Sequence, residues 1–252
     1  MLALEASRGE LEVDYALFSD TQWEPTQIYS HLDWLETELA KADIPLLRCT
    51  KGDVRDMVKN RKEGKRGASI PAFIKKKEGG REGVLMRQCT REYKIEPLEK
   101  TIRYEIVGLK PRQWMPKDVH INVIMGISYD ELTRCTMSKA KWKTHQYPLV
   151  DRKITRQDCI GWLKEHYPGR TFVRSACLGC PYRSNSEFAW VRDNDPEGWE
   201  SVVAFDREIR NLFGEGESQL FLHRSCEPID EIELGEVEND SWLDECSGMC
   251  GN

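Results

Sequence analysis

The sequence predicts an α/β fold, in which an open and mostly parallel sheet carries helices on both faces. Short apolar runs typical of buried strands alternate with segments of helical spacing over about the first 170 residues. The run His120–Ser128 is apolar, β-branched and bounded by polar residues, which is typical of a central strand. Alternation of this kind favours a parallel sheet, and ligands of such sheets bind at the carboxyl ends of the strands.

The first strands and helices follow one another without long gaps. Val13–Asp20 is an apolar run that ends in a turn, and residues 28–39 then place Ile and Leu at helical spacing. Ile44–Cys49 repeats the strand pattern, and Asp53 is suited to cap a helix running towards Arg61. We therefore expect two strand–helix units here.

The next elements are less regular. Residues 62–83 are rich in Gly and Lys and predict a long loop or a partly ordered lid. Val84–Cys89 indicates another buried strand, followed by a helix with Pro97 in its first turn. Further along, Thr155–Asp158 resembles a capping box, and Asp195–Pro196 is a strong helix start.

Length and composition limit the class of protein. A chain of 252 residues can bury one sizeable core, and 39% hydrophobic with 32% charged residues is a globular composition. We expect a nucleotide-binding domain over residues 1–170 and a cysteine-bearing C-terminal extension over residues 171–252. No apolar run is long enough to cross a bilayer and the first residues lack a secretory signal, so we expect a cytoplasmic protein without a membrane partner.

Two close cysteine pairs and one distant cysteine are the strongest chemical signal. Cys177 and Cys180 form a CLGC pair, Cys246 and Cys250 form a CSGMC pair, and Cys89 lies far upstream. Disulfides are rare in a reducing compartment, whereas metal-binding and redox thiols are common there. Each short spacing lets two sulfurs reach one metal, so the pattern predicts a tetrahedral thiolate site.

Charge is distributed unevenly. Residues 227–252 contain nine carboxylates and no Lys or Arg, so the rest of the chain is net positive although the total is −6. Lys59–Arg81 holds nine Lys or Arg residues. Such a run can contact the phosphates of a nucleotide or a nucleic acid, or it can be a solvated loop.

Three of the predicted strand ends carry strings that resemble a known superfamily. FSDTQWEP at Phe18–Pro25 resembles the turn after the second strand of PP-loop nucleotide-binding proteins. CTREYKIEPL at Cys89–Leu98 resembles a segment of phosphoadenosine phosphosulfate reductases, and GISYDELTR at Gly126–Arg134 is similar to a turn of the same superfamily. The similarity extends from about Asp14 to Tyr182, so the chain resembles a reductase-like member of the PP-loop, or adenine nucleotide alpha hydrolase-like, group.

The resemblance implies an adenine nucleotide, ATP or phosphoadenosine phosphosulfate, as ligand. The residues that match its binding positions are Asp20, Thr21, Arg87 and Gly126. PP-loop proteins begin with a strand and an SGGxDS-like loop, and nothing of this kind precedes Val13. Residues 1–8 resemble the helix that follows this loop, which implies either a protein that starts further upstream or one without the phosphate cradle.

The same resemblance implies four catalytic positions. They are Cys89, Arg91, Asp130 and Arg134. Arg87 and Arg91 flank Cys89 and favour its thiolate. Asp130 and Arg134 follow the predicted central strand, where their charges suit magnesium or a substrate phosphate, with an ordinary surface ion pair as the competing interpretation.

In iron–sulfur adenylyl sulfate reductases, two adjacent cysteines join a later CxxC pair around a four-iron cluster. Thr90 stands at the position of the second cysteine here, so Cys89, Cys177 and Cys180 match three of the four ligands. Cys246 or Cys250 can supply the fourth ligand. We expect either a 4Fe–4S cluster or a zinc ion.

Two functions follow. The first is an adenine-nucleotide-using oxidoreductase or transferase of sulfur or adenylyl chemistry, assisted by the thiolate-bound group. The alternative is a non-catalytic, zinc-stapled module that binds nucleic acid through Lys59–Arg81, with Cys177, Cys180, Cys246 and Cys250 as the closed zinc site.

Overall fold

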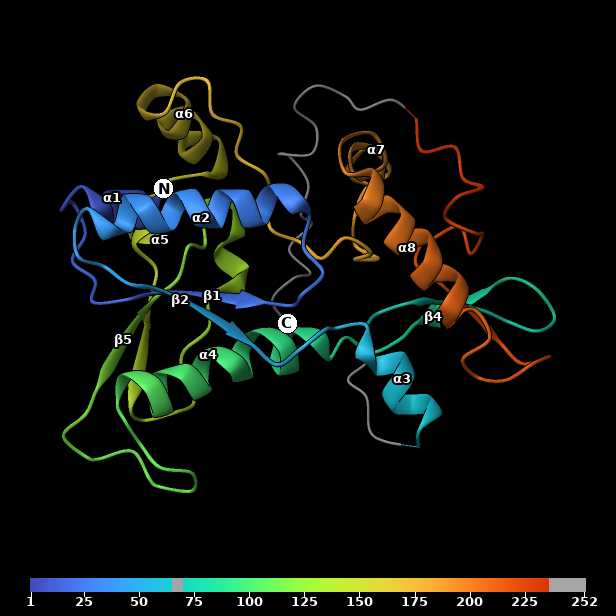
Figure 1. Cartoon of the computed structure of the whole chain (residues 1–252), viewed down its shortest axis with the longest axis horizontal. Helices are drawn as coiled ribbons and strands as arrows, with labels where there is room; N and C mark the ends of the chain where they lie inside the picture. The colour runs from blue at the N-terminus through green and yellow to red at the C-terminus, as the bar shows by residue number, and fades with distance from the viewer. Residues whose placement is uncertain (65–69, 236–252) are drawn as a thin grey trace.

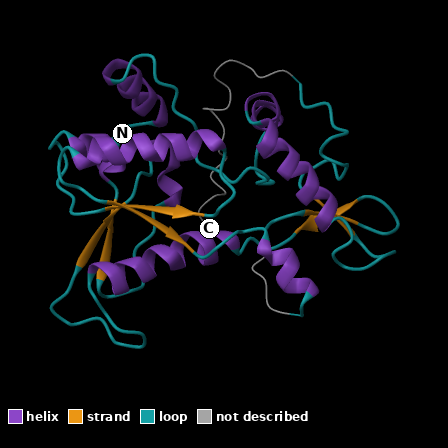
Figure 2. Ribbon diagram, viewed as in Figure 1, coloured by secondary structure: helices purple, strands orange, loops and turns teal. Residues whose placement is uncertain are grey.

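The computed structural model describes residues 1–64 and 70–235, and it has the α/β composition that the sequence predicts. Its strands gather in two groups, one near the N-terminus and one beside α7 and α8 (Figures 1 and 2). No helix in these ranges combines the length and the apolar character that crossing a membrane requires.

The first parallel pair confirms two predicted strands. β1 (Ala16–Asp20) pairs with β2 (Leu46–Thr50) in parallel, so that Asp20 lies opposite Thr50 at the carboxyl ends. The connection contains the predicted helix, α2 (Thr26–Ala40), whose apolar positions are buried. α1 (Leu2–Ser7) packs against α2, and Figure 1 shows α2 on one side of this pair and α4 on the other.

A long irregular helix covers residues 90–106. It consists of a π-helical turn η1 (Thr90–Ile95), α4 (Glu96–Thr101) and a second π-helical turn η2 (Ile102–Ile106). Pro97 lies in the first turn of α4, as predicted, but it has no N–H to donate to Tyr93 O four residues earlier. Ser19 Oγ donates to that carbonyl instead, at 2.7 Å, which ties β1 to η1.

The second parallel pair is smaller than expected. β5 (Ile121–Ile124) confirms a strand within the predicted run His120–Ser128 and pairs with β6 (Lys143–Gln146) in parallel, whereas its central place in a larger sheet stays a prediction. β6 was not predicted, since its KTHQ sequence is polar and lacks the apolar signal of a buried strand. The two parallel pairs are separate two-stranded sheets in the described residues, so the single open sheet stays a prediction.

Three further helical segments lie close to this pair in sequence. They are η3 (Tyr129–Arg134), α5 (Pro148–Asp151) and α6 (Arg156–His166). α6 begins with the predicted capping box, in which Thr155 and Asp158 bond to each other's backbone N–H.

An antiparallel sheet corrects two predictions. β3 (Phe73–Lys75) pairs with both β4 (Arg81–Val84) and β7 (Gln219–Phe221). The predicted buried strand Val84–Cys89 is wrong, because β4 ends where that segment begins. The predicted loop over residues 62–83 instead contains a hairpin, since Gly79 and Gly80 adopt positive φ and reverse the chain between β3 and β4.

The largest core joins distant parts of the sequence. α3 (Asp56–Lys62), α7 (Asn185–Asn194) and α8 (Pro196–Ile209) surround it, the last starting at the predicted cap Asp195. Its buried residues come from both sides of position 170, including Val54, Phe188 and Ile229. The division into domains at residue 170 stays a prediction, and the segments on its two sides share this core.

Candidate thiol cluster and its cleft

Three of the five predicted ligand cysteines lie within electrostatic range of one another in the structure. Cys89 lies at the start of the helix that covers residues 90–106, and Cys177 and Cys180 lie on the loop before α7. A negative charge on Cys180 raises the pKa of both Cys89 and Cys177, so the three thiols are within electrostatic range of one another. Cys89 is 88 residues away from Cys177 in the sequence, and the fold supplies their proximity.

Two thiols of the cluster, those of Cys89 and Cys177, are buried enough to stay protonated. Burial, followed by the nearby Glu24 carboxylate, raises the pKa of Cys177 to about 12. Burial and then Cys180 raise the pKa of Cys89, while Lys94 and Arg87 oppose the increase. Metal ligation requires thiolates, so a bound cation or added positive charge is needed before these sulfurs ionise.

Lys94 supplies positive charge to the cluster. Burial alone would lower its pKa, but the thiolate form of Cys177, then the Glu24 carboxylate and the thiolate forms of Cys180 and Cys89, outweigh burial and raise it above the usual value. The ammonium group therefore stays charged beside the thiols. This charge lowers the cost of forming a thiolate at Cys177 and Cys89, but burial outweighs it.

A polar network links the cluster to the carboxyl end of β1. Thr21, fully buried directly after β1, has its Oγ1 3.2 Å from Cys177 Sγ and also donates to Glu24 Oε1 at 3.2 Å. Ser175 Oγ donates to Glu24 Oε2 at 3.1 Å. Thr21 was predicted to contact a nucleotide, and the structure brings it against the cysteine pair.

The CLGC loop is fixed by backbone contacts. The buried guanidinium of Arg183 donates to Cys177 O at 3.0 Å and to Ala176 O at 2.5 Å. Leu178 N donates to Trp23 O at 2.8 Å, which joins the loop to the turn after β1. These contacts satisfy carbonyl and amide groups of the loop and fix the backbone that carries the two sulfurs.

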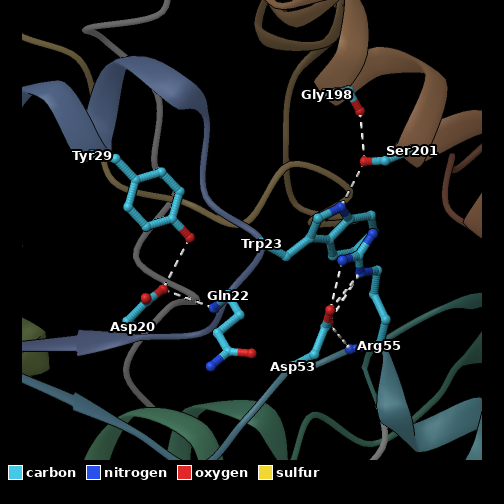
Figure 3. A network of polar contacts seen from close by, with 8 residues as sticks. All are labelled: Asp20, Gln22, Trp23, Tyr29, Asp53, Arg55, Gly198 and Ser201. Carbon is cyan, nitrogen blue, oxygen red and sulfur yellow. Dashed lines mark hydrogen bonds and ion pairs between the residues drawn. The ribbon is translucent and has the colours of Figure 1, made fainter.

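Trp23 anchors the turn that carries Thr21 and Glu24. Its Nε1 donates to Ser201 Oγ at 2.9 Å, and Ser201 in turn donates to Gly198 O in α8 (Figure 3). The Arg55 guanidinium lies over the indole at 5.5 Å. The turn after β1 is therefore held by Arg55, directly before α3, and by Ser201 of α8.

Asp20 has a local role in this turn. Figure 3 shows its carboxylate accepting from Gln22 N at 2.7 Å and from Tyr29 Oη at 3.0 Å. Gln22 has a positive φ, which the Asp20 contact stabilises. The predicted ligand residue thus holds the turn, and its nucleotide contact stays a prediction.

A cleft of about 630 Å³ lies beside Cys89. Its lining residues come from the end of β2 and from residues 86–96, and they are Lys51, Met86, Arg87, Gln88, Arg91, Glu92 and Glu96. Lys51 pairs with Glu92 at 2.7 Å, and the exposed Arg91 lies 3.5 Å from Glu96. Arg87 lies over the Tyr182 ring at 5.6 Å, just past the CLGC pair. Three cationic side chains, those of Lys51, Arg87 and Arg91, therefore line the cleft. Glu92 and Glu96 neutralise part of their charge.

Three other predicted residues lie elsewhere. Asp130 Oδ1 accepts from Arg156 N at the start of α6, and Arg134 pairs with Glu131 at 2.5 Å. Gly126 faces Leu2 of α1, 3.9 Å from where its Cβ would be. In the described ranges no hydrogen bond or ion pair joins these three to the thiol cluster, so their roles in catalysis and binding stay predictions.

Metal ligation is incomplete in the part of the chain that the structure describes. No group of three or more His, Cys, Asp or Glu side chains there has the arrangement of a metal site. Cys246 and Cys250, the predicted source of a fourth ligand, lie outside the described residues. The soft donors Cys89, Cys177 and Cys180 fit zinc or an iron–sulfur cluster in chemistry, and further donors are needed to complete the coordination.

Sequence reasoning missed the charged partners of the thiols. Glu24 and Lys94 lie inside the FSDTQWEP and CTREYKIEPL strings, yet no pattern in the sequence indicates that they meet. Arg183 follows the CLGC pair closely in sequence, and this position is a signal that could have been used. Its burial is seen only in the structure. No family model matches this chain, and no solved structure matches it at a significant level.

Proposed function

We propose that this protein is an adenine-nucleotide-using enzyme of sulfur or adenylyl transfer chemistry, similar to phosphoadenosine phosphosulfate reductases, with a thiolate-bound iron–sulfur cluster or metal. The observation that carries the proposal is the convergence of Cys89, Cys177 and Cys180 with Lys94 beside Thr21. These residues lie at the carboxyl end of a parallel strand, where ligands of α/β proteins bind.

The cleft beside Cys89 supports an anionic substrate. Lys51 follows β2 and lies with Arg87 and Arg91 around the same space of about 630 Å³, which is large enough for a nucleotide-sized molecule. Glu92 and Glu96 hold Lys51 and Arg91 in place by ion pairs. An incoming phosphate or sulfate exchanges these pairs for charge-assisted hydrogen bonds.

Cys89, Cys177 and Cys180 are the residues that would hold the cluster or metal. When bound, such a group supplies electron transfer or Lewis acidity, and it keeps its thiolate ligands deprotonated. Lys94 offsets negative charge next to the sulfurs, and Arg183 orients the CLGC backbone. Three protein ligands leave one position for a tail cysteine or for a substrate sulfur.

The test combines metal analysis with calorimetry on the whole protein purified without oxygen. We expect brown protein with iron and acid-labile sulfide, and binding of ATP or phosphoadenosine phosphosulfate that weakens at least tenfold in Arg87→Ala. Lys41→Ala, a lysine on the exposed end of α2 that pairs with Glu38, is the matched control. Absence of binding to both nucleotides would refute the proposal.

A second candidate is the zinc-stapled module that binds nucleic acid, and the hairpin β3–β4 favours it. Lys76, Lys77 and Arg81 are exposed around its turn, where their charges can contact the phosphates of a nucleic acid. The rest of the basic run lies partly outside the described residues. Lys75 in β3 is directed inward and donates to Cys226 O at 3.2 Å.

This candidate is tested by one colourless zinc per chain and by fluorescence anisotropy with duplex DNA and RNA. Lys76→Gln with Lys77→Gln should lower the salt dependence of binding by about two counterions. Unchanged salt dependence, or no binding at low salt, would exclude the hairpin as the contact.

A further inference from the structure

Trp114 is exposed to a degree that no other described tryptophan reaches. It lies in the loop of residues 107–120, between η2 and β5, and it is 89% exposed. The other six tryptophans of the described ranges are buried or half-buried. A large aromatic side chain is normally packed, because leaving its rings in water forfeits the free energy of burying them. Trp114 is therefore a candidate contact for a partner.

The loop around Trp114 has a defined conformation. Gln113 N donates to Lys110 O at 3.0 Å, and Lys110 N donates to Gln113 Oε1 at 2.9 Å, which closes a turn directly before Trp114. The Arg103 guanidinium donates to Gln113 O at 2.7 Å and attaches this turn to η2. The buried Leu109, whose N–H donates to Arg103 O at 2.9 Å, anchors the start of the loop. Because a fixed turn presents Trp114, less conformational entropy is lost when it binds a partner.

Exposed cations lie on both sides of Trp114 in this loop. They are Lys110, Arg112 and Lys117, and no ion pair joins any of them to another residue of the described ranges. Asp118 is the one carboxylate among residues 107–120. Arg112 is two residues from Trp114 and Lys117 is three, so their backbones lie within about 7 Å and about 11 Å of it. The loop therefore combines an exposed aromatic ring with net positive charge.

A second basic segment lies at the same end of the β5–β6 pair. β5 and β6 are parallel, with Ile121 opposite Lys143, so the segments that lead into them enter the pair from one end. Ile121 N donates to Trp142 O at 2.8 Å, which ties the two segments together. Lys139 and Lys141 are exposed in the segment before β6. Figure 1 shows the loop before β5 extending away from the body of the molecule at this end.

A single-stranded nucleic acid fits this combination of groups. Its unpaired bases have flat faces that stack on an exposed indole, and its phosphates contact nearby Lys and Arg side chains. A duplex hides the faces of its bases in the stack, so Trp114 gains little from it. An acidic peptide would contact the cations and leave the ring unused. A lipid surface requires more apolar area to insert, and the neighbouring Arg112 and Gln113 are exposed and polar.

We propose that residues 107–120, together with Lys139 and Lys141, form a binding surface for single-stranded nucleic acid. One base stacks on Trp114, and the phosphates on either side of that base contact Arg112 and Lys117. Stacking and phosphate contacts read no base edge, so binding tolerates any sequence and weakens with salt. This surface is distinct from the β3–β4 hairpin of the second candidate function, and it does not depend on the thiol cluster.

The experiment is fluorescence anisotropy of the full chain with labelled oligothymidylate and oligouridylate of about twelve nucleotides. Trp114→Ala should weaken binding at least fivefold, since stacking of one base contributes about 5- to 150-fold, whereas Trp114→Phe keeps a ring and should retain most of the affinity. Arg112→Gln with Lys117→Gln should lower the slope of log K against log salt by about 1.4. No binding at low salt, unchanged binding by Trp114→Ala, or an unchanged slope overturns the proposal.

Matched variants separate this surface from the rest of the molecule. Tyr15→Ala removes another exposed aromatic side chain, before β1, and should leave the affinity unchanged. In a chain that also carries Lys76→Gln and Lys77→Gln in the hairpin, Trp114→Ala should still weaken binding at least fivefold. Urea unfolding of each variant establishes that it is folded, and the midpoint for Trp114→Ala should equal that of the unaltered protein because the side chain is exposed.

Competing partners complete the test. They are a duplex of the same length and vesicles of phosphatidylcholine with phosphatidylserine. Both should bind more weakly than the single strand at the same salt concentration. Equal binding of the duplex, or binding of the vesicles that depends on Trp114 while the single strand does not bind, overturns the proposal.

Discussion

Gly179 lies so close to Trp23 that a Cβ atom at this position would come within 2.2 Å of the indole Cη2. The backbone here does not adopt a positive φ, so close approach is the reason for glycine. The indole in turn is held by Ser201 of α8. The close packing of the CLGC loop against Trp23 therefore depends on the absence of a side chain at Gly179.

Gly179→Ala should displace the CLGC loop from Trp23. Overpacking of this kind typically costs about 1–3 kcal/mol, and we expect a loss of that size in the free energy of unfolding by urea, together with weaker metal retention. Gly161→Ala is the control, because a Cβ there meets nothing within 4 Å and alanine favours a helix. Equal stability of the two variants would contradict the packing argument.

Lys94→Met should make the cluster thiols harder to ionise. Lys94 lowers the pKa of Cys89 and Cys177, so its removal raises both values further above the ordinary thiol range. The measurement is the pH dependence of alkylation of metal-free protein, resolved by mass spectrometry of the peptides. The midpoints for Cys89 and Cys177 should move to higher pH. The midpoint for Cys135, whose pKa is raised by burial and partly lowered by Arg134, should not move.

Asp195→Ala should remove two helix caps at once. Asp195 is buried and accepts from Gly198 N at 3.0 Å in α8 and from Thr26 N at 2.9 Å at the start of α2. Loss of a cap costs about 0.5–2 kcal/mol, so two buried contacts predict about 2–3 kcal/mol in urea unfolding. Asp158→Ala, which removes the exposed carboxylate that accepts from Thr155 N in the capping box of α6, should cost less.

The free energy of unfolding should fall in acid, because burial disfavours the protonated form of His31. Its folded-state pKa of about 4 lies below the ordinary 6.5, since burial and then Arg170 disfavour the charged ring. The unfolded chain takes up the proton as pH falls through 6.5, whereas the folded protein does so only near pH 4, so stability declines across that window. His31→Gln should flatten the decline in unfolding free energy between pH 6.5 and 4.5; an unchanged slope would exclude this histidine as its source.

Local patterns predicted the elements that depend on nearby residues. The apolar runs around β1 and β2, the helical spacing of α2 and the caps at Thr155 and Asp195 all match the structure. Each of these signals acts within a few residues. Burial and capping therefore agreed with local propensity at these positions.

Elements that depend on distant partners were missed. β3 and β7 have three residues each, and their pairing joins segments about 145 positions apart. β6 has a polar sequence, and only its pairing with β5 makes it a strand. The apolar run Val84–Cys89 has strand propensity, but the hairpin turn at Gly79 and Gly80 shifts the strand to earlier residues.

The candidate site shows the same division. The cysteine spacing predicted that Cys177 and Cys180 act together with Cys89, and the structure brings these three into electrostatic range. Glu24 and Lys94 approach the thiols through tertiary packing, so no spacing rule identifies them. Asp130 and Arg134 followed a predicted strand end as the family resemblance requires, yet they contact α6 and Glu131 instead.

The pairing of β3 with β7 sets an order for folding during synthesis. Phe73 faces Phe221 across the two strands, and the buried Asp206 of α8 accepts from Leu222 N directly after β7. The sheet that carries the β3–β4 hairpin is therefore completed only after residue 221 has left the ribosome. Until then, one edge of β3 has no strand beside it in the nascent chain, and this half of the protein cannot close.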